Sequence, residues 1–320
     1  MKRFRNILYV AEPSVEQDAT IARAASLARN NDARLTLLDI VPALPRPPEG
    51  VAGVPDRESI QQAFLNERRE QLVALAGKCG DARVDVDVRI GRMFLETIQA
   101  VLSNGHDLVI KPAQDPDWTS RLFGSDDMHL LRKCPCPVWL MKAGEKPDHD
   151  RIVAAVDIDD DEPGTAEAAL NREILELAGS LALSDTASLH IIHVWDAPEA
   201  GLVRLWSSEP EKAERSLVDA EHERHREGMD RLCHALREHI GDDDYARLSP
   251  RVHMKRGRAG QMIPRMVNDL GADLVVMGTV ARTGVPGLLI GNTAETVLDQ
   301  LQCSTLAVKP PGFVSPVKPA

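Results

Sequence analysis

The sequence predicts an α/β fold: two tandem copies of a five-stranded, parallel-sheet, nucleotide-binding-like (Rossmann-like) domain, packed with pseudo-two-fold symmetry. Three observations support this fold, namely the length of the chain, an internal repeat, and the alternation of short apolar runs with helical segments. The chain has 320 residues, about twice the ~150 expected of one domain. Because 43% of them are hydrophobic, there is enough apolar material for two cores.

The internal repeat divides the chain into two domains. Residues 6–12 resemble residues 151–157 at an offset of 145, and later strands repeat at offsets of 166 and 167. The second copy therefore has about 20 additional residues between its first and fourth strands. We place the first domain at residues 1–143 and the second at 150–312, joined by a polar segment that contains Gly and Pro.

Each strand is predicted from a short apolar or β-branched run, and each helix from the longer segment between two such runs. Nearly continuous apolar strands indicate a parallel sheet covered by helices on both faces. The second copy repeats this order, with a long charged helix around 208–240 in place of the loop and second helix. In the first copy the strands are expected at 5–11, 34–41, 83–89, 107–111 and 137–142, the helices at 14–30, 58–78, 93–104 and 126–133, and a Pro-rich loop at 42–56.

Composition narrows the ligands and the location. With 38 basic and 49 acidic residues the net charge is −11, and only 3% of residues are aromatic, which disfavours a nucleic-acid ligand. No apolar run approaches the ~18–20 residues of a membrane span, and the apolar stretch at 7–11 is too short for a signal peptide. Five scattered cysteines are typical of a reducing compartment, so we expect a cytoplasmic protein. Cys134 and Cys136 are expected to be buried as small apolar side chains.

Ligands of such sheets bind at the carboxyl ends of the strands, so the loops after the first and fourth strands form the candidate site. Residues 276–298 (VMGTVARTGVPGLLIGNTAETVL) carry the informative pattern. They are similar to the signature of the universal stress protein family, whose nucleotide-binding members carry G-x2-G-x9-G-[S/T] after the fourth strand. Gly278 and Gly291 match the first and third glycines, while Ala281 and Asn292 depart from the pattern.

The resemblance covers both halves and implies a tandem universal stress protein with a pocket for ATP or a related nucleotide in the second domain. It implies that Asp157 lies beside the sugar and that the backbone around Val194 faces the adenine. A glycine lets the backbone approach a phosphate, and a helix start presents unpaired N–H groups to an anion. The expected pocket residues are Asp157, Val194, Gly278, Arg282, Gly291, Asn292 and Thr293.

Two alternatives stay open at this loop. Asn292 is a good N-cap, and Glu295 would complete a capping box, so the loop could simply begin a helix. Arg282 and the run 255–258 (KRGR) could pair with phosphates or form a solvated loop.

The first domain departs from the family pattern. Counted at the same spacing, Lys111 and Gln114 replace the first two glycines, and Glu12 is the counterpart of the acidic residue after the first strand. Asp126 and Asp127 would occupy the helix start that a phosphate needs. We expect that this half has lost nucleotide binding. The final strands, at 138–141 and 305–308, are edges that mediate dimer contacts in the family, and a tandem chain could satisfy that contact internally.

No enzymatic motif is found, whether G-x-S-x-G, H-E-x-x-H, a P-loop, H-x-G-H or S-G-G-x-D, so we do not expect an enzyme, although weak ATP hydrolysis stays open. His222, His225 and Cys233 share one face of the long helix but span too many turns for one zinc ion, and zinc is not expected. A solvated face or a partner-binding helix are the alternatives there. His190 and His193 lie on opposite faces of a strand and cannot chelate together.

These inferences predict a non-catalytic universal stress response protein with a ligand-sensing or scaffold role. The alternative is an interaction scaffold that binds no nucleotide, or a binder of another phosphorylated or lipid-like metabolite. A protein partner or self-association is compatible with both. We expect neither a specific nucleic acid nor a membrane as a partner.

Overall fold

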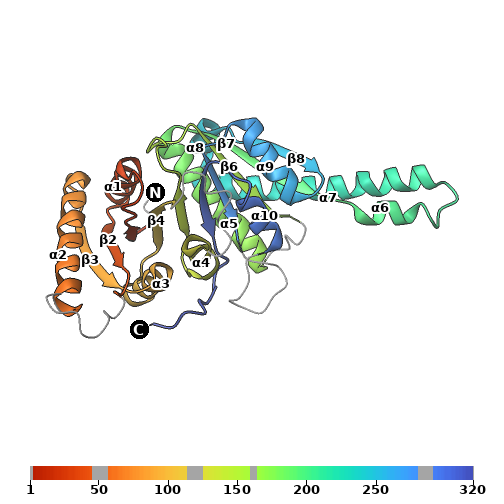
Figure 1. The fold of residues 1–320 in the computed structure, drawn as a ribbon. Helices are drawn as coiled ribbons and strands as arrows, with labels where there is room; N and C mark the ends of the chain where they lie inside the picture. Colours follow the sequence, from red (N-terminus) through yellow and green to blue (C-terminus); the bar gives the residue numbers. More distant parts are fainter. Residues whose placement is uncertain (1–2, 45–56, 114–124, 159–163, 280–290, 320) are drawn as a thin grey trace. The chain divides into compact units, whose positions relative to one another are not determined.

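The computed structural model describes residues 3–44, 57–113, 125–158, 164–279 and 291–319. The chain divides into two compact units, one built mainly from Met1–Asp148 and the other mainly from His149–Gly312 (Figure 1). Each unit holds a five-stranded parallel sheet, and together they form two tandem α/β domains as predicted. No helix in the described ranges has both the length and the apolarity that crossing a membrane requires.

The first unit has the strand order β3-β2-β1-β4-β5, and its adjacent strands run parallel. The order reverses between β1 and β4, so this is where a doubly wound sheet opens a crevice at its carboxyl edge. Residues 7–10 of β1 are fully buried in succession, which means that both faces of the sheet are covered. The strands are β1 (Asn6–Val10), β2 (Arg34–Val41), β3 (Val84–Ile90), β4 (Leu108–Pro112) and β5 (Val138–Met141).

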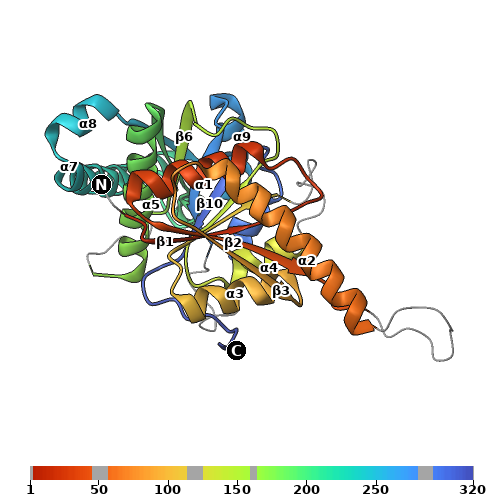
Figure 2. The same ribbon diagram turned by 90° about the vertical axis from the view of Figure 1, so that its left-hand side faces the viewer.

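Helices cover both faces of this sheet, with α1 and α2 on one face and α3 and α4 on the other (Figure 2). Ser125 caps α4 by accepting a hydrogen bond from the amide three residues on, at 3.2 Å. The expected helix at 14–30 begins four residues later than predicted. The helical elements are α1 (Asp18–Asn31), α2 (Arg57–Ala76), the 3-10 turn η1 (Gly77–Cys79), α3 (Met93–Asn104) and α4 (Asp126–Lys133).

The second unit repeats the pattern with the order β10-β9-β6-β7-β8, again parallel throughout. Its order reverses between β6 and β9, the counterparts of β1 and β4. Ile152 of β6 lies opposite Leu189 and Leu274, as Ile7 of β1 lies opposite Leu35 and Leu108. The strands are β6 (Arg151–Val156), β7 (Ser188–Trp195), β8 (Arg251–Arg256), β9 (Leu274–Gly278) and β10 (Ser304–Val308).

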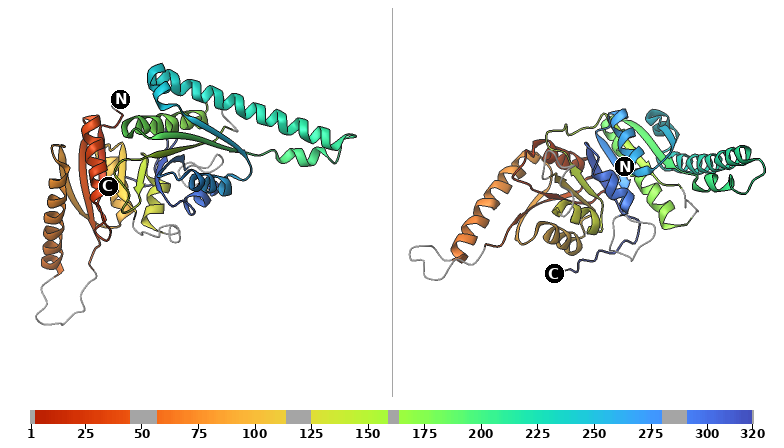
Figure 3. Two further views of the ribbon diagram at one scale, coloured as in Figure 1. Left: turned by 90° about the horizontal axis from the view of Figure 1, so that it is seen from above. Right: turned by 45° about the vertical axis from the view of Figure 1, so that its right-hand side comes forward.

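The predicted long charged helix is confirmed as α7, and two short helices that the sequence did not predict flank it. The shorter of these, α6, packs beside the first half of α7, and this helical hairpin projects beyond the sheet of its unit (Figures 1 and 3). The helices are α5 (Ala166–Asp185), α6 (Pro198–Val203), α7 (Pro210–Ile240), α8 (Asp242–Leu248), α9 (Ala259–Leu270) and α10 (Asn292–Leu298).

The strand register corrects one sequence alignment between the halves. Asp107 and Asp273 are structurally equivalent. Each accepts hydrogen bonds from two consecutive backbone amides at the start of the first strand of its unit. From these residues the fourth strands align at an offset of 166. Pro112, not Lys111, is therefore the counterpart of Gly278, and Lys111 is the counterpart of Met277 in β9.

Candidate functional site

The carboxyl edge of the second sheet carries Asp157, the first residue after β6. Asn171 of α5 holds its backbone from both sides: Asn171 Oδ1 accepts from Asp157 N at 3.1 Å, and Asn171 Nδ2 donates to Asp157 O at 2.5 Å. Asn171 is buried whereas Asp157 is exposed. Asp157 is therefore an exposed residue of the sheet edge on a backbone that a buried amide fixes.

A chain of hydrogen bonds between histidines lies beside Asp157. A carbonyl oxygen only accepts, so His193 Nδ1 of β7 donates to Val156 O, at 3.1 Å. In its neutral form His193 then accepts at Nε2 from the Nδ1–H of His225 of α7, at 3.0 Å. His225 Nε2 accepts from Arg224 Nη2 at 3.3 Å. The network thus assigns both tautomers and ties α7 to the ends of β6 and β7.

Close packing also holds α7 against the end of β6. A Cβ at Gly228 of α7 would lie 2.2 Å from Ile158 Cγ2, so only glycine lets the helix approach the segment that follows β6. Val194, in β7 next to His193, is buried. Sequence reasoning placed Val194 and Asp157 at this edge correctly, but it missed the histidine pair and the role of Gly228.

Gly278 ends β9 at this edge, and the structure gives it a packing role. A Cβ at Gly278 would lie 2.7 Å from Leu170 Cδ2 of α5. A substitution such as Gly278→Val would therefore disturb α5 as well as any ligand, and it cannot separate binding from stability.

The start of α10 corrects a second expectation. Gly291 is the N-cap, with φ −64° and ψ 138°, and Asn292 is the first helical residue, so Asn292 forms no capping box. Gly291 N donates to Thr279 O at 3.1 Å, and this backbone contact engages the amide. Asn292 and Thr293 are exposed. The predicted pocket residue Arg282 lies outside the described residues, as do Ala281, Gln114 and Gly124.

Basic side chains line the neighbouring part of the edge. Lys255 and Arg256 are the last residues of β8, opposite Val194 and Trp195 of β7, and Arg258 is the N-cap of α9. All three basic side chains are exposed, and Arg256 Nε lies 3.6 Å from an Asp196 carboxylate oxygen. The basic run therefore belongs largely to a strand end beside Val194 and not to a separate loop.

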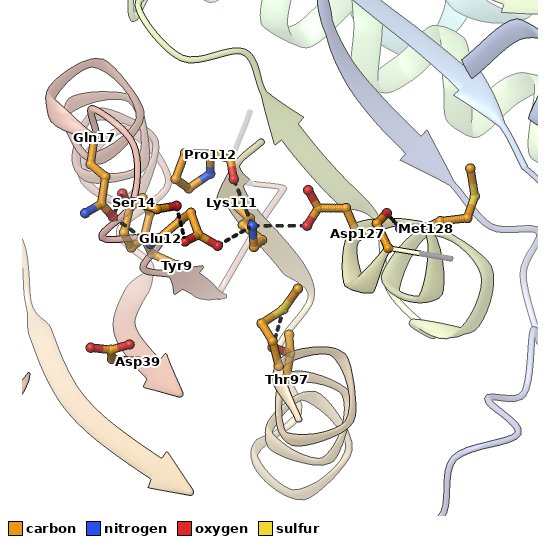
Figure 4. Close-up of polar contacts among 12 residues, drawn as sticks. Tyr9, Glu12, Ser14, Gln17, Asp39, Thr97, Lys111, Pro112, Asp127 and Met128 are labelled. Carbon is orange, nitrogen blue, oxygen red and sulfur yellow. Dashed lines mark hydrogen bonds and ion pairs between the residues drawn. The ribbon is translucent and has the colours of Figure 1, made fainter. Parts of the chain in front are cut away.

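The same edge of the first unit holds an internal ion cluster (Figure 4). The fully buried Lys111 of β4 places Nζ 3.0 Å from Asp127 Oδ1, 3.3 Å from Glu12 Oε2 and 3.0 Å from Pro112 O. Asp127 belongs to the first turn of α4 and Glu12 follows β1. A lysine ammonium thus lies between two carboxylates where the sequence predicted a degenerate ligand site.

Further contacts engage Glu12. Ser14 Oγ donates to Glu12 Oε1 at 2.7 Å, and Gln17 Oε1 accepts from Glu12 N and from the Tyr9 hydroxyl, both at 2.9 Å. Burial raises the pKa of Tyr9, which keeps this hydroxyl a donor. In the second unit Met277 occupies the position of Lys111. The two units therefore differ in charge at equivalent positions.

The candidate zinc ligands do not converge. His222 packs on Trp195 at 5.4 Å between ring centroids, His225 bonds to His193, and Cys233 interacts with Tyr245. Across the described ranges no group of three or more His, Cys, Asp or Glu side chains is arranged to hold a metal ion.

Two other sequence predictions are confirmed. Cys134 and Cys136 are both buried, with 3.6 Å between their Sγ atoms. His190 bonds to His253 at 2.9 Å, while His193 bonds to α7, as expected for opposite faces of one strand.

The two five-stranded parallel sheets, with helices between successive strands, define a tandem Rossmann-like α/β protein. The chain belongs to the universal stress protein family, whose model matches residues 3–142 and 149–309. It is 28% identical over 322 residues to universal stress protein E of Escherichia coli strain K12, covering 99% of this chain and 98% of the relative.

A universal stress protein E homolog of Haemophilus influenzae is also 28% identical, covering 96% of this chain and 98% of the relative. A solved structure, that of the functionally unknown protein PA1789 from Pseudomonas aeruginosa PAO1, is 27% identical with a TM-score of 0.66. That likeness covers 97% of this chain and 94% of the solved one. The family resemblance seen in the sequence is thus confirmed along nearly the whole chain.

Proposed function

We propose that this universal stress protein acts in a stress response by binding a small phosphorylated ligand of the ATP or AMP type, at the carboxyl edge of its second unit only. The observation that carries the proposal is the contrast between the two acidic residues. Asp157 is exposed on a fixed backbone, whereas Glu12 is bound by an internal ammonium.

A carboxylate in the position of Asp157 is a strong acceptor for ligand hydroxyl groups, because charge-assisted hydrogen bonds are about twice as strong as neutral ones. Lys255 and Arg258, exposed on the same edge, supply positive charge for a phosphate group. The amide of Gly291 contributes little in this proposal, since it donates to Thr279. A ligand held in this way depends on Asp157 more than on the glycine loop.

The first unit opposes such a ligand on electrostatic grounds. A phosphate placed near Asp127 and Glu12 would have to displace Lys111 or lie against two carboxylates. The first arrangement costs free energy because it breaks the ion pairs of a buried ammonium, and the second because like charges repel. The proposal is for binding without turnover as the main role, so the ligand would act as a signal.

The proposal is tested by releasing bound small molecules from the denatured protein and identifying them by mass spectrometry. Calorimetry with ATP and with AMP then measures affinity and stoichiometry. We expect one site per chain, and Asp157→Asn should weaken binding at least tenfold, about 1.4 kcal/mol. Asp219→Asn, which removes the same charge from an exposed position of α7, is the matched control and should bind like the wild type.

Three results would reject the proposal. Two sites per chain would contradict the loss of binding in the first unit. Unchanged affinity in Asp157→Asn would place the ligand elsewhere. Release of a lipid-like molecule, or no release together with no nucleotide binding, would favour another metabolite or a scaffold.

A further inference from the structure

The helical hairpin of α6 and α7 ends in an apolar tip, which we define as Leu202, Leu205 and Trp206. The exposed fractions of these side chains are 58%, 74% and 89%. Three large apolar side chains within five consecutive positions form a patch, and exposed patches of this kind mark interaction sites more often than single exposed residues do.

The hairpin that carries the tip is well packed at its root. Trp195, Ala197 and Ala200 are buried there, and Leu217 and Val218 of α7 pack against them. The backbone of the tip is also hydrogen-bonded: Leu205 N donates to Leu202 O at 2.9 Å. The tip is therefore a formed turn on a fixed base, and little conformational entropy is lost when it binds.

Charges around the tip indicate what kind of surface it fits. Residues 199–215 contain four acidic and three basic side chains, so this segment is nearly neutral although the chain carries −11. Arg204 pairs with Glu214 at 3.0 Å, Lys212 with Glu209 at 3.0 Å, and Arg215 with Glu211 at 3.5 Å. An anionic lipid surface attracts clusters of basic residues, which this segment lacks. Alternating charges around an apolar centre instead suit a copy of the same surface.

We propose that the tip is a self-association surface, through which two copies of this chain pair about a two-fold axis. In such an isologous contact the same patch is buried on both copies, and the ion pairs within each segment leave little net charge to repel the other copy. The proposal rests on the hairpin alone and is independent of nucleotide binding.

The size of the patch sets the expected strength. An aromatic side chain buries ~150–250 Å², so the tryptophan and two leucines together bury roughly 400 Å² per copy and roughly 800 Å² per pair. With the flanking side chains this falls in the class of weak, transient interfaces below ~1,200 Å². We therefore expect a monomer–dimer equilibrium that depends on protein concentration.

Sedimentation velocity of the full chain over a wide concentration range tests the proposal. The wild type should shift toward a dimer as concentration rises, and the double variant Leu205→Ser, Trp206→Ser should raise the dissociation constant at least tenfold. Both side chains are exposed, so circular dichroism should show an unchanged fold. Val73→Ser, which removes an apolar side chain that is 54% exposed on α2, is the matched control and should dimerise like the wild type.

Fluorescence adds a direct readout of the tip. Trp139 and Trp195 are buried, at 0% and 5% exposure, and a Trp118→Phe background removes the remaining tryptophan besides Trp206. In that background Trp206 should dominate the change, and its emission should move to shorter wavelength as the protein concentration increases. A wild type that stays monomeric at the highest concentration reached overturns the proposal, as does a dimer that the double variant leaves intact. Binding of the monomer to phosphatidylcholine vesicles, with or without phosphatidylglycerol, that the double variant abolishes would assign the tip to a lipid surface instead.

Discussion

The Lys111 ammonium lies 3.0 Å from the carboxylate of Asp127, and both side chains are almost completely buried, at 0% and 5% exposure. Taking these charges out of water is costly, and the cost is offset only because the groups are paired and Glu12 supplies a second carboxylate at 3.3 Å. The cluster connects the ends of β1 and β4 to the first turn of α4.

Removing the ammonium should therefore destabilise the first unit. Lys111→Met, which installs the residue found at the equivalent position of the second unit, leaves the buried Asp127 carboxylate and the partly buried Glu12 carboxylate without this cation. We expect a loss of about 3–5 kcal/mol in the free energy of unfolding, measured by urea denaturation. A loss below about 1 kcal/mol would show that the cluster is solvated in solution.

A triple variant provides the control for this prediction. Lys111→Met combined with Glu12→Gln and Asp127→Asn removes all three charges, and it should recover much of the lost stability because no charge stays buried alone.

The elements of the first unit followed closely from its sequence. β2, α3 and α4 have the predicted bounds, because apolar runs and breakers mark their ends. Helix α1 starts late because Gln17 turns its side chain back to Glu12 and Tyr9, a contact that no periodicity reveals. In the second unit α6 and α8 were missed, since helices of six and seven residues are too short to show a period.

The candidate site was predicted only in outline. Asp157 and Val194 were placed correctly because they follow from strand ends. Lys111 was aligned one residue away from its counterpart, because the pattern was counted back from Gly124 at an offset of 167, whereas the fourth strands and the helices that follow them align at 166. The contacts of His193 with His225 join residues 32 positions apart, on a strand and a helix, and depend on packing that the sequence does not show.

The histidine pair beside Asp157 should contribute measurably to stability. His225→Leu leaves Nε2 of the buried His193 without its donor, and an unsatisfied buried polar group costs about 1–3 kcal/mol. Urea denaturation should show this loss. His222→Leu is the matched control three residues away: His222 is exposed and contacts Trp195 only through its ring face, so its replacement should stay within about 0.5 kcal/mol. Equal effects of the two variants would mean that the hydrogen bond contributes nothing specific.

Two glycines in the hairpin region should respond oppositely to alanine. Gly228→Ala forces a Cβ to within 2.2 Å of Ile158 Cγ2, so α7 must shift, at a cost of about 1–3 kcal/mol. Gly201→Ala in α6 meets no heavy atom within 4 Å and should stabilise by about 0.5–1 kcal/mol through helix propensity. Thermal unfolding followed by circular dichroism distinguishes them. Adding Ile158→Ala to Gly228→Ala should relieve part of the strain, so the two substitutions should be less destabilising together than the sum of their separate effects. Purely additive effects would argue against this contact.

The pair formed by His190 and His253 should make the second unit sensitive to acid. Burial lowers the pKa of both rings, and nearby positive charges, including Arg251 for each, lower it further. The unfolded chain, with histidine pKa values near 6.5, therefore binds more protons than the folded chain below that pH, and stability falls as the pH falls.

Each such histidine adds at most about 1.4 kcal/mol per pH unit to this slope, so His253→Gln should flatten the decline in unfolding free energy between about pH 6.5 and 5. Urea midpoints across that range measure the effect. His234→Gln removes a histidine that is 70% exposed on α7, and its profile should overlay that of the wild type. The unfolding free energy of His253→Gln could instead decline with falling pH as steeply as that of the wild type. The folded pair would then take up protons as readily as the unfolded chain, and the acid sensitivity would arise from another group.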